Sequence, residues 1–497
     1  MLWIIGILIV VIGIIYMCHM KTFNYWKYKN VPFEKPVPIF GNFLDVVLGK
    51  QQVGTAIRKI YDKFDDSIPY FGIYIFHKPF LVIRSKEITK RILIKDFDVF
   101  QNRPLYYNDK IDPMAANALF IMRGEQWRFL RQKLSPIYTS GKMRKMMTLM
   151  KDVTRHMEQY FDSMQGEDVD VRDFANRYSI DIICSCAFGI DSKSLLQKHS
   201  EIKSMANAML DLKSLKRNLS IGAYFFCPLM VELFKLQFLD KESSDFFIDI
   251  FKHSYHEREK LNVKRNDLID LLQNLQKEEV DGDLFKLTDS KLCAQALVFF
   301  TAGSETTVGT LSFCFYELAM NIDIQNKLWN EVMQNLNSEG TITYEALTQM
   351  TYLDLVIKET LRKYPLTHIL MRYAEQEYTI EETGLKLEKG TPVIISMTSL
   401  HYDERYFPNP DKFDPERFRG DNAKNLQYVY LPFGDGPRKC IGDRFALLSM
   451  KIGIAMFVKD YEVLPSKKTE IPIRQSNTAF FLIPESGNIF LKVKKRI

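Results

Sequence analysis

Residues 432–442 read Pro-Phe-Gly-Asp-Gly-Pro-Arg-Lys-Cys-Ile-Gly, and the rest of the chain can be interpreted outward from them. The segment is a glycine-rich loop with one cysteine, Cys440, and it leads into an apolar helical pattern from Phe445 to Val458. We expect main-chain N–H groups of the loop and of the helix N-terminus to face the sulfur and favour its thiolate, which is the form that binds metals. A partly buried thiolate needs a counter-charge, and ferric iron would supply it.

The number of ligands restricts the metal. Zinc needs four ligands and an iron–sulfur cluster needs several cysteines, but no CxxC pair or Cys/His cluster lies near Cys440. One thiolate is a complete protein ligand set when a porphyrin supplies the other four donors. The alternative is an unreactive buried cysteine in a helix-capping loop, which is the commoner role of a free cysteine.

The spacing around Cys440 resembles the haem-binding loop of the cytochrome P450 family, F-x-x-G-x-R-x-C-x-G. Phe433, Gly436, Arg438 and Gly442 fill every other specified position. The resemblance implies that Cys440 is the axial ligand of haem b, which is iron protoporphyrin IX. It also implies that Arg438 pairs with a haem propionate and that Phe433 packs beside the sulfur and keeps water away from it.

A long apolar helical pattern from about Asp289 to Met320 contains Ala302-Gly303-Ser304-Glu305-Thr306-Thr307. We expect Thr288 or Asp289 to cap its N-terminus. A glycine inside a helix costs about 1 kcal/mol relative to alanine, and an ionisable side chain in an apolar helix costs more unless it has a partner. A purely structural helix has little use for either residue.

This segment matches the family's [AG]-G-x-[DE]-T-[ST] motif in full. The resemblance implies that Ala302 and Gly303 leave a gap for dioxygen beside the porphyrin. It also implies that Thr306 supplies a hydroxyl in this gap and that Glu305 is a proton source connected to bulk water. We therefore predict general-acid chemistry by Glu305 and Thr306 opposite Cys440.

Three further residues match propionate-binding positions. Trp127 and Arg131 lie four residues apart on a predicted helix and share a face; by themselves they are an aromatic–cation pair on a helix surface. The family's W-x-x-x-R motif donates two hydrogen bonds to a haem propionate, and arginine suits a bidentate carboxylate contact. Arg372, in Leu-Met-Arg-Tyr-Ala, matches another arginine of this kind.

Glu359 and Arg362, three residues apart on a predicted helix, would ordinarily be a solvated surface pair worth a few tenths of a kcal/mol. The resemblance implies a different role. Together with Arg417 in the Pro-Glu-Arg-Phe segment, they match the E-x-x-R and P-E-R-F elements. In the family these form a buried triad that fixes the core.

The composition is that of a large globular protein. The chain has 497 residues, of which 46% are hydrophobic, and its net charge of +6 is spread over 67 basic and 61 acidic residues without a nucleic-acid-binding block. Seven cysteines, an odd number in mostly apolar surroundings, favour a reducing, cytosol-facing location. Short β-like runs at 70–76 and 80–83 followed by helical patterns indicate a mostly α fold with small β-sheets (α+β), as in cytochromes P450.

The N-terminus predicts a membrane anchor. Residues 2–20 carry no charge and are long enough to span the roughly 30 Å hydrocarbon core. A cleaved signal peptide is the alternative, but a basic n-region and a small-x-small site are missing. Lys21, Lys27 and Lys29 follow, which places the remainder in the cytoplasm. We expect an anchor (1–20), a basic and proline-rich strap (21–44) and one haem-thiolate catalytic domain (45–497).

The expected substrate is lipophilic, because the regions that line the pocket in the family are large and apolar here. These regions are Tyr106–Phe120, Phe299, Leu366–Met371 and Phe480–Phe481. Residues 220–239 are apolar and aromatic. They form either a buried helix or, as the resemblance suggests, a surface lip that enters the bilayer.

The resemblance, closest to insect microsomal members, implies a monooxygenase that inserts one atom of O2 into a lipophilic substrate. Because the chain has no flavin or nicotinamide motif, electrons must come from a separate protein. This implies NADPH–cytochrome P450 reductase, with cytochrome b5 as a second donor, at the endoplasmic reticulum membrane. Lys133, Arg144, Lys145 and Lys439 are candidates to face an acidic donor.

Two alternatives remain open from the sequence. One is a haem-thiolate isomerase or dehydratase, which rearranges a peroxide without a reductase; such proteins usually lack the pair formed here by Glu305 and Thr306. The other is a non-catalytic haem carrier or gas sensor, which would show no NADPH-driven oxidation.

Overall fold

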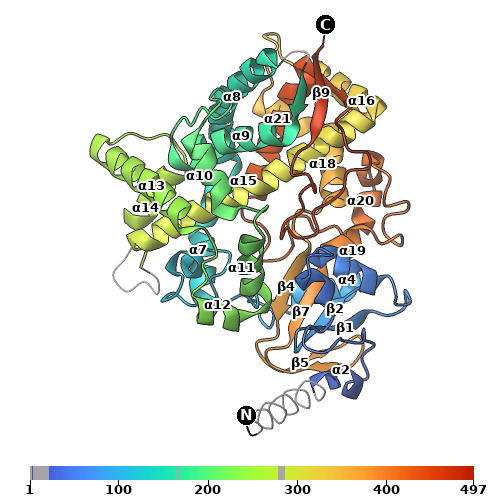
Figure 1. The fold of residues 1–497 in the computed structure, drawn as a ribbon. Helices are drawn as coiled ribbons and strands as arrows, with labels where there is room; N and C mark the ends of the chain where they lie inside the picture. Colours follow the sequence, from blue (N-terminus) through green and yellow to red (C-terminus); the bar gives the residue numbers. More distant parts are fainter. Residues whose placement is uncertain (1–2, 4–21, 165–166, 278–285, 497) are drawn as a thin grey trace.

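The computed structural model describes residues 3, 22–164, 167–277 and 286–496. Over these described residues the fold is mostly helical with three small sheets, which confirms the predicted α+β class. Figure 1 shows the four-stranded sheet at one end of the molecule, beside α4, and the long helices in the body. The predicted anchor lies outside the described residues except for Trp3. Within the described segments, no helix is both long and apolar enough to cross a membrane.

The long helices form the body and the strands form the smaller end. The helices are α2 Tyr25–Tyr28, α3 Leu44–Val47, α4 Val53–Tyr61, α5 Lys86–Lys90, η1 Arg91–Lys95, α6 Pro113–Asn117, α7 Gly124–Leu134, η2 Ser135–Tyr138, α8 Ser140–Ser163, α9 Val171–Ile183, η3 Cys184–Phe188, α10 Glu201–Leu210, α11 Leu215–Phe226, α12 Pro228–Phe234, α13 Lys241–Leu261, α14 Leu268–Lys277, α15 Asp289–Met320, α16 Ile322–Gln334, α17 Tyr344–Gln349, α18 Thr351–Lys363, α19 Met397–His401, η4 Pro415–Phe418, α20 Asn422–Asn425 and α21 Asp443–Asp460. The strands are β1 Tyr70–Ile75, β2 Lys78–Ile83, β3 Asp168–Asp170, β4 Ile369–Tyr373, β5 Tyr378–Ile380, β6 Leu385–Leu387, β7 Pro392–Ser396, β8 Tyr461–Pro465 and β9 Phe490–Lys495.

The largest sheet has the strand order β1-β2-β7-β4, and the other two have the orders β3-β9-β8 and β5-β6. The β1–β2 and β4–β7 pairs are antiparallel, whereas β2 and β7 run parallel. Both β-like runs predicted from the sequence therefore form strands of one sheet. Its last strand, β4, carries Arg372, so this sheet positions one of the predicted haem contacts.

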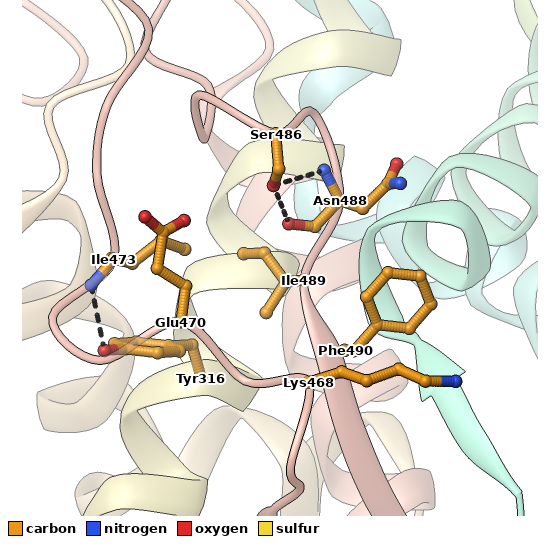
Figure 2. A pocket seen from close by; sticks show the side chains of 8 residues that line it. All are labelled: Tyr316, Lys468, Glu470, Ile473, Ser486, Asn488, Ile489 and Phe490. Atoms are coloured by element: carbon orange, nitrogen blue, oxygen red, sulfur yellow. Dashed lines mark hydrogen bonds between the residues drawn. The ribbon is translucent and has the colours of Figure 1, made fainter.

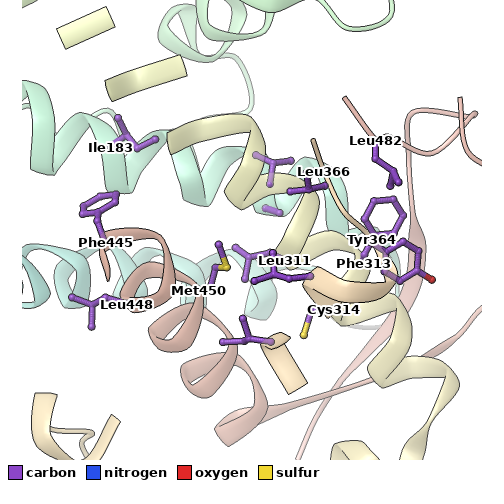
Figure 3. Packing of buried hydrophobic residues seen from close by; sticks show 14 of the residues in the cluster. Ile183, Leu311, Phe313, Cys314, Tyr364, Leu366, Phe445, Leu448, Met450 and Leu482 are labelled. Atoms are coloured by element: carbon purple, nitrogen blue, oxygen red, sulfur yellow. The ribbon is translucent and has the colours of Figure 1, made fainter. Parts of the chain in front are cut away.

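Helix α15 is the centre of the helical body. It spans Asp289–Met320 and its C-terminal half is buried on nearly all sides. Thr288 occupies the predicted N-cap position, but its side chain makes no capping hydrogen bond. Figure 3 shows Leu311, Phe313 and Cys314 of this helix among apolar side chains of α21 and of the segment that follows α18, including Met450, Tyr364 and Leu366. Phe313 stacks on Tyr364 with ring centroids 4.2 Å apart. The segment that carries Glu305 and Thr306 is therefore part of a closely packed element.

The strap between the predicted anchor and the catalytic domain is docked on β1. Trp26 is fully buried, and its indole N–H donates to the carbonyl of Ile73 at 3.2 Å. A Cβ atom on Gly72 would lie 2.3 Å from the Trp26 ring, so the strand needs glycine there. The division into anchor, strap and domain stays a prediction, but the described part of the strap is not a free linker.

The predicted buried triad is confirmed. The Arg362 guanidinium donates to both carboxylate oxygens of Glu359, at 2.8 and 2.9 Å, and both side chains are fully buried. Arg417 contacts Glu359 at 3.3 Å, and Arg362 also donates to the carbonyls of His401 and Pro410. The pair is therefore an internal connection between α18 and the 401–417 segment rather than a solvated surface pair.

We predict that Arg362→Ala lowers the free energy of unfolding by about 3–5 kcal/mol, because it leaves the Glu359 carboxylate buried without its partner. Lys358→Ala on the same helix is the matched control. The Lys358–Asp354 contact of 2.7 Å is partly exposed, so its loss should cost less than about 1 kcal/mol. Chemical denaturation followed by circular dichroism measures both values, and equal losses would contradict the prediction.

Candidate haem site

The Cys440 loop is closed by its own main chain. Cys440 N–H donates to the carbonyl of Phe433 at 2.8 Å, and Gly434 N–H donates to that of Leu431 at 2.9 Å. Gly436 has a φ of +71°, and a Cβ atom there would lie 1.9 Å from the carbonyl oxygen of Leu93 in η1. The loop therefore needs glycine at 436 and rests directly on the backbone of η1.

The surroundings of Cys440 create the need for a counter-charge. Burial raises the pKa of the Cys440 thiol, while the N–H group of Gly442 and the charges of Arg131 and Lys439 act in the opposite direction. Because burial dominates, these groups leave the thiol protonated unless a further positive charge binds the sulfur. The expected N–H donation is thus present at Gly442, and a metal cation would complete the stabilisation.

Cys440 faces a hollow although it lies among interior groups. Its side chain reaches accessible surface, and a cavity of about 320 Å³ opens beside it. The cavity is lined by Arg131, Ser135, Tyr138, Thr139, Lys439, Cys440, Ile441, Asp443 and Arg444. Within the described segments, no group of three or more His, Cys, Asp and Glu side chains could hold a metal. A protein-only metal centre is therefore not formed by these residues, in line with a porphyrin that supplies the other donors.

Four arginines come together near the loop: Arg103, Arg131, Arg372 and Arg438. Burial first, and then the charges of Arg372, Arg438 and Arg131, hold the pKa of Arg103 well below its ordinary value. Burial also lowers the pKa of Arg372 to about 10, and burial with the neighbouring arginines lowers that of Arg438 to about 9. Such a concentration of buried positive charge calls for an anion.

Some guanidinium N–H groups of these arginines have no hydrogen-bond partner in the protein and could donate to that anion. Arg438 donates to the carbonyls of Gln101 and Met122, and Arg372 donates to that of Met371. Arg438 Nη1 and Arg372 Nε are buried without a hydrogen-bond partner. Two carboxylates of a porphyrin would satisfy these donors and offset the mutual repulsion of the guanidinium groups, so the residues present fit haem.

Arg103 was missed by the sequence analysis. It donates to the carbonyl of Phe120, and its guanidinium lies over the Phe120 ring at 4.4 Å. Its position in the Asn-Arg-Pro segment gives no motif by which to identify it. A count of buried arginines converging on one point would have found it, but this requires the fold.

Helix α7 brings Trp127 and Arg131 to the same region, on one face as predicted. The Arg438 guanidinium lies over the Trp127 ring at 3.9 Å. Arg131 lines the hollow with Cys440. In this structure Trp127 supports an arginine by a cation–π contact, and Arg131 stands beside the sulfur.

The segment of α15 around Thr306 also has an open side. Ala302 is exposed although it lies in the middle of a helix that is mostly buried. Thr306 Oγ1 donates to the carbonyl of Ala302 at 2.7 Å. Glu305 forms an ion pair with Arg172 of α9, a partner that the sequence analysis did not identify. This arginine balances the carboxylate inside the helix bundle, and its Nη1 is buried without a partner.

The predicted pocket walls come from separate elements. Phe299, one turn before Ala302, packs on Phe445 of α21 with centroids 5.3 Å apart, and Phe480 packs on Phe225 of α11 at 4.4 Å. A different cavity of about 290 Å³ lies at the C-terminal part of α15 (Figure 2). It is lined by Tyr316, Lys468, Glu470, Ile473, Ser486, Asn488, Ile489 and Phe490, none of which is a predicted site residue.

Comparison with known proteins agrees with this geometry. The family model described as Cytochrome P450 matches residues 31–491. Cytochrome P450 6k1 of Blattella germanica is 36% identical, over 95% of this chain and 93% of its own. Probable cytochrome P450 6a14 of Drosophila melanogaster is 36% identical over the full length of both chains. Cytochrome P450 6A1 of Musca domestica is 37% identical, over 95% and 94%.

We predict opposite effects of Arg103→Gln on the haem-free and haem-bound forms. Loss of one guanidinium relieves repulsion, so the apoprotein should melt at an equal or higher temperature. Haem affinity should fall about tenfold or more, because a charged hydrogen bond contributes roughly 1.5–3 kcal/mol.

Haem titration and thermal melting measure the two effects. Arg128→Gln is the matched control, because this α7 arginine is exposed and contacts Asp98 at 2.9 Å. An Arg103→Gln variant that loses apoprotein stability and binds haem normally would contradict the assignment.

Proposed function

The chain belongs to the cytochrome P450 family, whose members bind haem b through a cysteine thiolate and act as monooxygenases, and we propose that Cys440 is this ligand. The observation that carries the proposal is the pairing of two features: a cysteine at a hollow, on a loop with Gly442 N–H directed to it, and four converging arginines nearby, of which Arg372 and Arg438 are buried. One group with a cationic metal and two carboxylates matches both. The haem, when bound, supplies the binding and activation of O2.

The protein groups divide this chemistry between them. Cys440 gives the iron an anionic ligand, and the loop's N–H groups limit the charge that the sulfur presents. The propionates would be held by Trp127, Arg131, Arg372, Arg438 and Arg103, which would orient the ring. Phe433, half-buried against the core, shields the sulfur side. The exposed Ala302 would leave space for O2 beside the bound group.

Glu305 and Thr306 move protons in this proposal. The Thr306 hydroxyl donates to the Ala302 carbonyl and therefore keeps lone pairs free to accept a proton donor at the open side of α15. Glu305 is held by Arg172. Release from this contact would let the carboxylate exchange a proton with water and pass it toward Thr306.

We further propose that the substrate is lipophilic and that electrons come from NADPH–cytochrome P450 reductase, with cytochrome b5 as a second donor. Phe299, Phe225 and Phe480 supply apolar walls. Of the four basic residues proposed to face the electron-donor protein, Lys439 contacts Asp443 at 2.7 Å and Arg144 contacts Glu345 at 2.5 Å. Their charges are therefore partly balanced, which leaves Lys133 and Lys145 as the stronger candidates to face an acidic donor.

The proposed location is the endoplasmic reticulum membrane, with the catalytic domain on the cytoplasmic side. Support comes from α12, where Leu229 is 72% exposed and Leu233 67% exposed, and from Ile39 of the strap at 58%. Residues 220–239 contain the end of α11 and the whole of α12 rather than one buried helix, which favours the surface lip. Large exposed apolar side chains of this kind suit a lipid surface.

Cys440→His should abolish the far-red-shifted Soret band of the reduced, carbon-monoxide-bound protein, because an imidazole replaces the anionic sulfur. Cys227→Ser, at a half-buried cysteine outside the loop, should keep this band. A Cys440→His variant with the band intact would refute the assignment of the ligand.

Thr306→Ala should uncouple NADPH consumption from product formation, with a several-fold rise in released peroxide. Thr307→Ala is the matched control, because its hydroxyl donates to the Gly303 carbonyl in the same way but its side chain is buried. Unchanged coupling in Thr306→Ala would remove the proposed role of this hydroxyl. A haem sensor would oxidise no substrate with purified reductase, and an isomerase would turn over a peroxide without it.

A further inference from the structure

His401, the last residue of α19, is fully buried between α18 and the start of the Cys440 loop. Leu431 N–H donates to His401 Nε2 at 3.0 Å. On the other side of the ring, Nδ1 lies 3.2 Å from the carbonyl oxygen of Arg362. These two contacts fix the protonation of the ring: Nε2 must be the acceptor, so Nδ1 carries the proton and donates to Arg362.

The bond to Leu431 continues as a chain of main-chain hydrogen bonds to the cysteine. Leu431 C=O accepts from Gly434 N–H at 2.9 Å, and Phe433 C=O accepts from Cys440 N–H at 2.8 Å. On the other side, Arg362 donates to the His401 carbonyl at 3.0 Å and is itself held by Glu359. His401 therefore connects the buried triad to the loop that presents the sulfur.

We propose that His401 is a positioning residue for the Cys440 thiolate: as a neutral imidazole it holds Leu431, and through Leu431 the loop, in the conformation that binds iron. This inference rests on the proposed function of Cys440. The mechanism needs the Nε2 lone pair. Protonation of Nε2 would remove the acceptor and leave the Leu431 N–H without its partner, which frees the start of the loop.

The environment keeps the ring neutral. Burial, and then the charge of Arg362, lowers the pKa of His401 to about 3. Arg362 faces the ring from α18, Tyr430 from the loop with centroids 5.5 Å apart, and Phe407 from the segment after α19 at 6.1 Å. Because the folded pKa lies below the ordinary value of 6.5, the contribution is fully present above about pH 6.5 and is lost as the pH falls toward 3.

Two amide substitutions separate the two contacts. In His401→Gln the side-chain oxygen can take the place of Nε2 and accept from Leu431. In His401→Asn the shorter amide can donate to the Arg362 carbonyl but cannot reach Leu431. Neither amide titrates in the acid range. His368→Gln is the control for loss of a buried neutral histidine, since the pKa of His368 is lowered by burial to about 4 and its Nδ1 contacts Thr398.

The full-length haem protein is reduced and bound to carbon monoxide, and the loss of the far-red-shifted Soret band is timed between about pH 7 and pH 4. Circular dichroism melting of the same samples reports global stability. At pH 7 we expect His401→Asn to lose the band about tenfold faster than His401→Gln, the factor of one missing buried hydrogen bond. Wild type and His368→Gln should accelerate below about pH 6.5, while His401→Gln should accelerate less than wild type, because it keeps the acid sensitivity of other buried groups such as His368.

Each other result has a definite meaning. Equal rates of band loss in the Asn and Gln variants, or the same acid acceleration in wild type and His401→Gln, would overturn the proposal. A purely structural histidine would lower the melting temperature of both variants and leave their band-loss rates equal. A wild-type protein without the band would instead overturn the assignment of Cys440.

Discussion

A cysteine sulfur beside a cluster of converging arginines is the arrangement on which the rest of this structure depends. Neither part is stable by itself: burial disfavours the thiolate of Cys440, and Arg103, Arg372 and Arg438 repel one another. One ligand that carries a metal cation and two carboxylates satisfies both. In the apoprotein these charges therefore interact unfavourably. Haem binding relieves this and so contributes to the free energy of folding.

The scaffold can be understood as the means of holding these charges in place. The Glu359–Arg362–Arg417 triad fixes α18 to the 401–417 segment, and the loop is attached to this core at its first residues. The four-stranded sheet supplies Arg372, α7 supplies Arg131, and the loop supplies Arg438. Elements distant in the sequence thus each contribute one charge.

Local motifs made much of this predictable. The loop, the helix of Asp289–Met320 and the first two strands follow from residues close in sequence. The buried triad does not, because Arg417 is distant from Glu359 in the chain, and it was expected only from the family's E-x-x-R and P-E-R-F elements. What the sequence could not reveal are partners set by tertiary packing. Arg103 and Arg172 lie in segments without a distinctive pattern, and their charges matter only because the fold places them beside Arg438 and Glu305. The same holds for His401, whose two ring nitrogens contact residues on either side in space but far apart in the chain.

The close contact between the Gly436 and Leu93 backbones has a consequence for chimaeras between this protein and its relatives. A single added methyl group at 436 would overlap the Leu93 carbonyl, so the shape of η1 and the shape of the cysteine loop are matched at the main-chain level. A chimaera that takes its C-terminal third from one parent and residues 91–95 from another would separate this matched pair. Crossover points that keep both segments from one parent should give the larger share of haem-loaded hybrids.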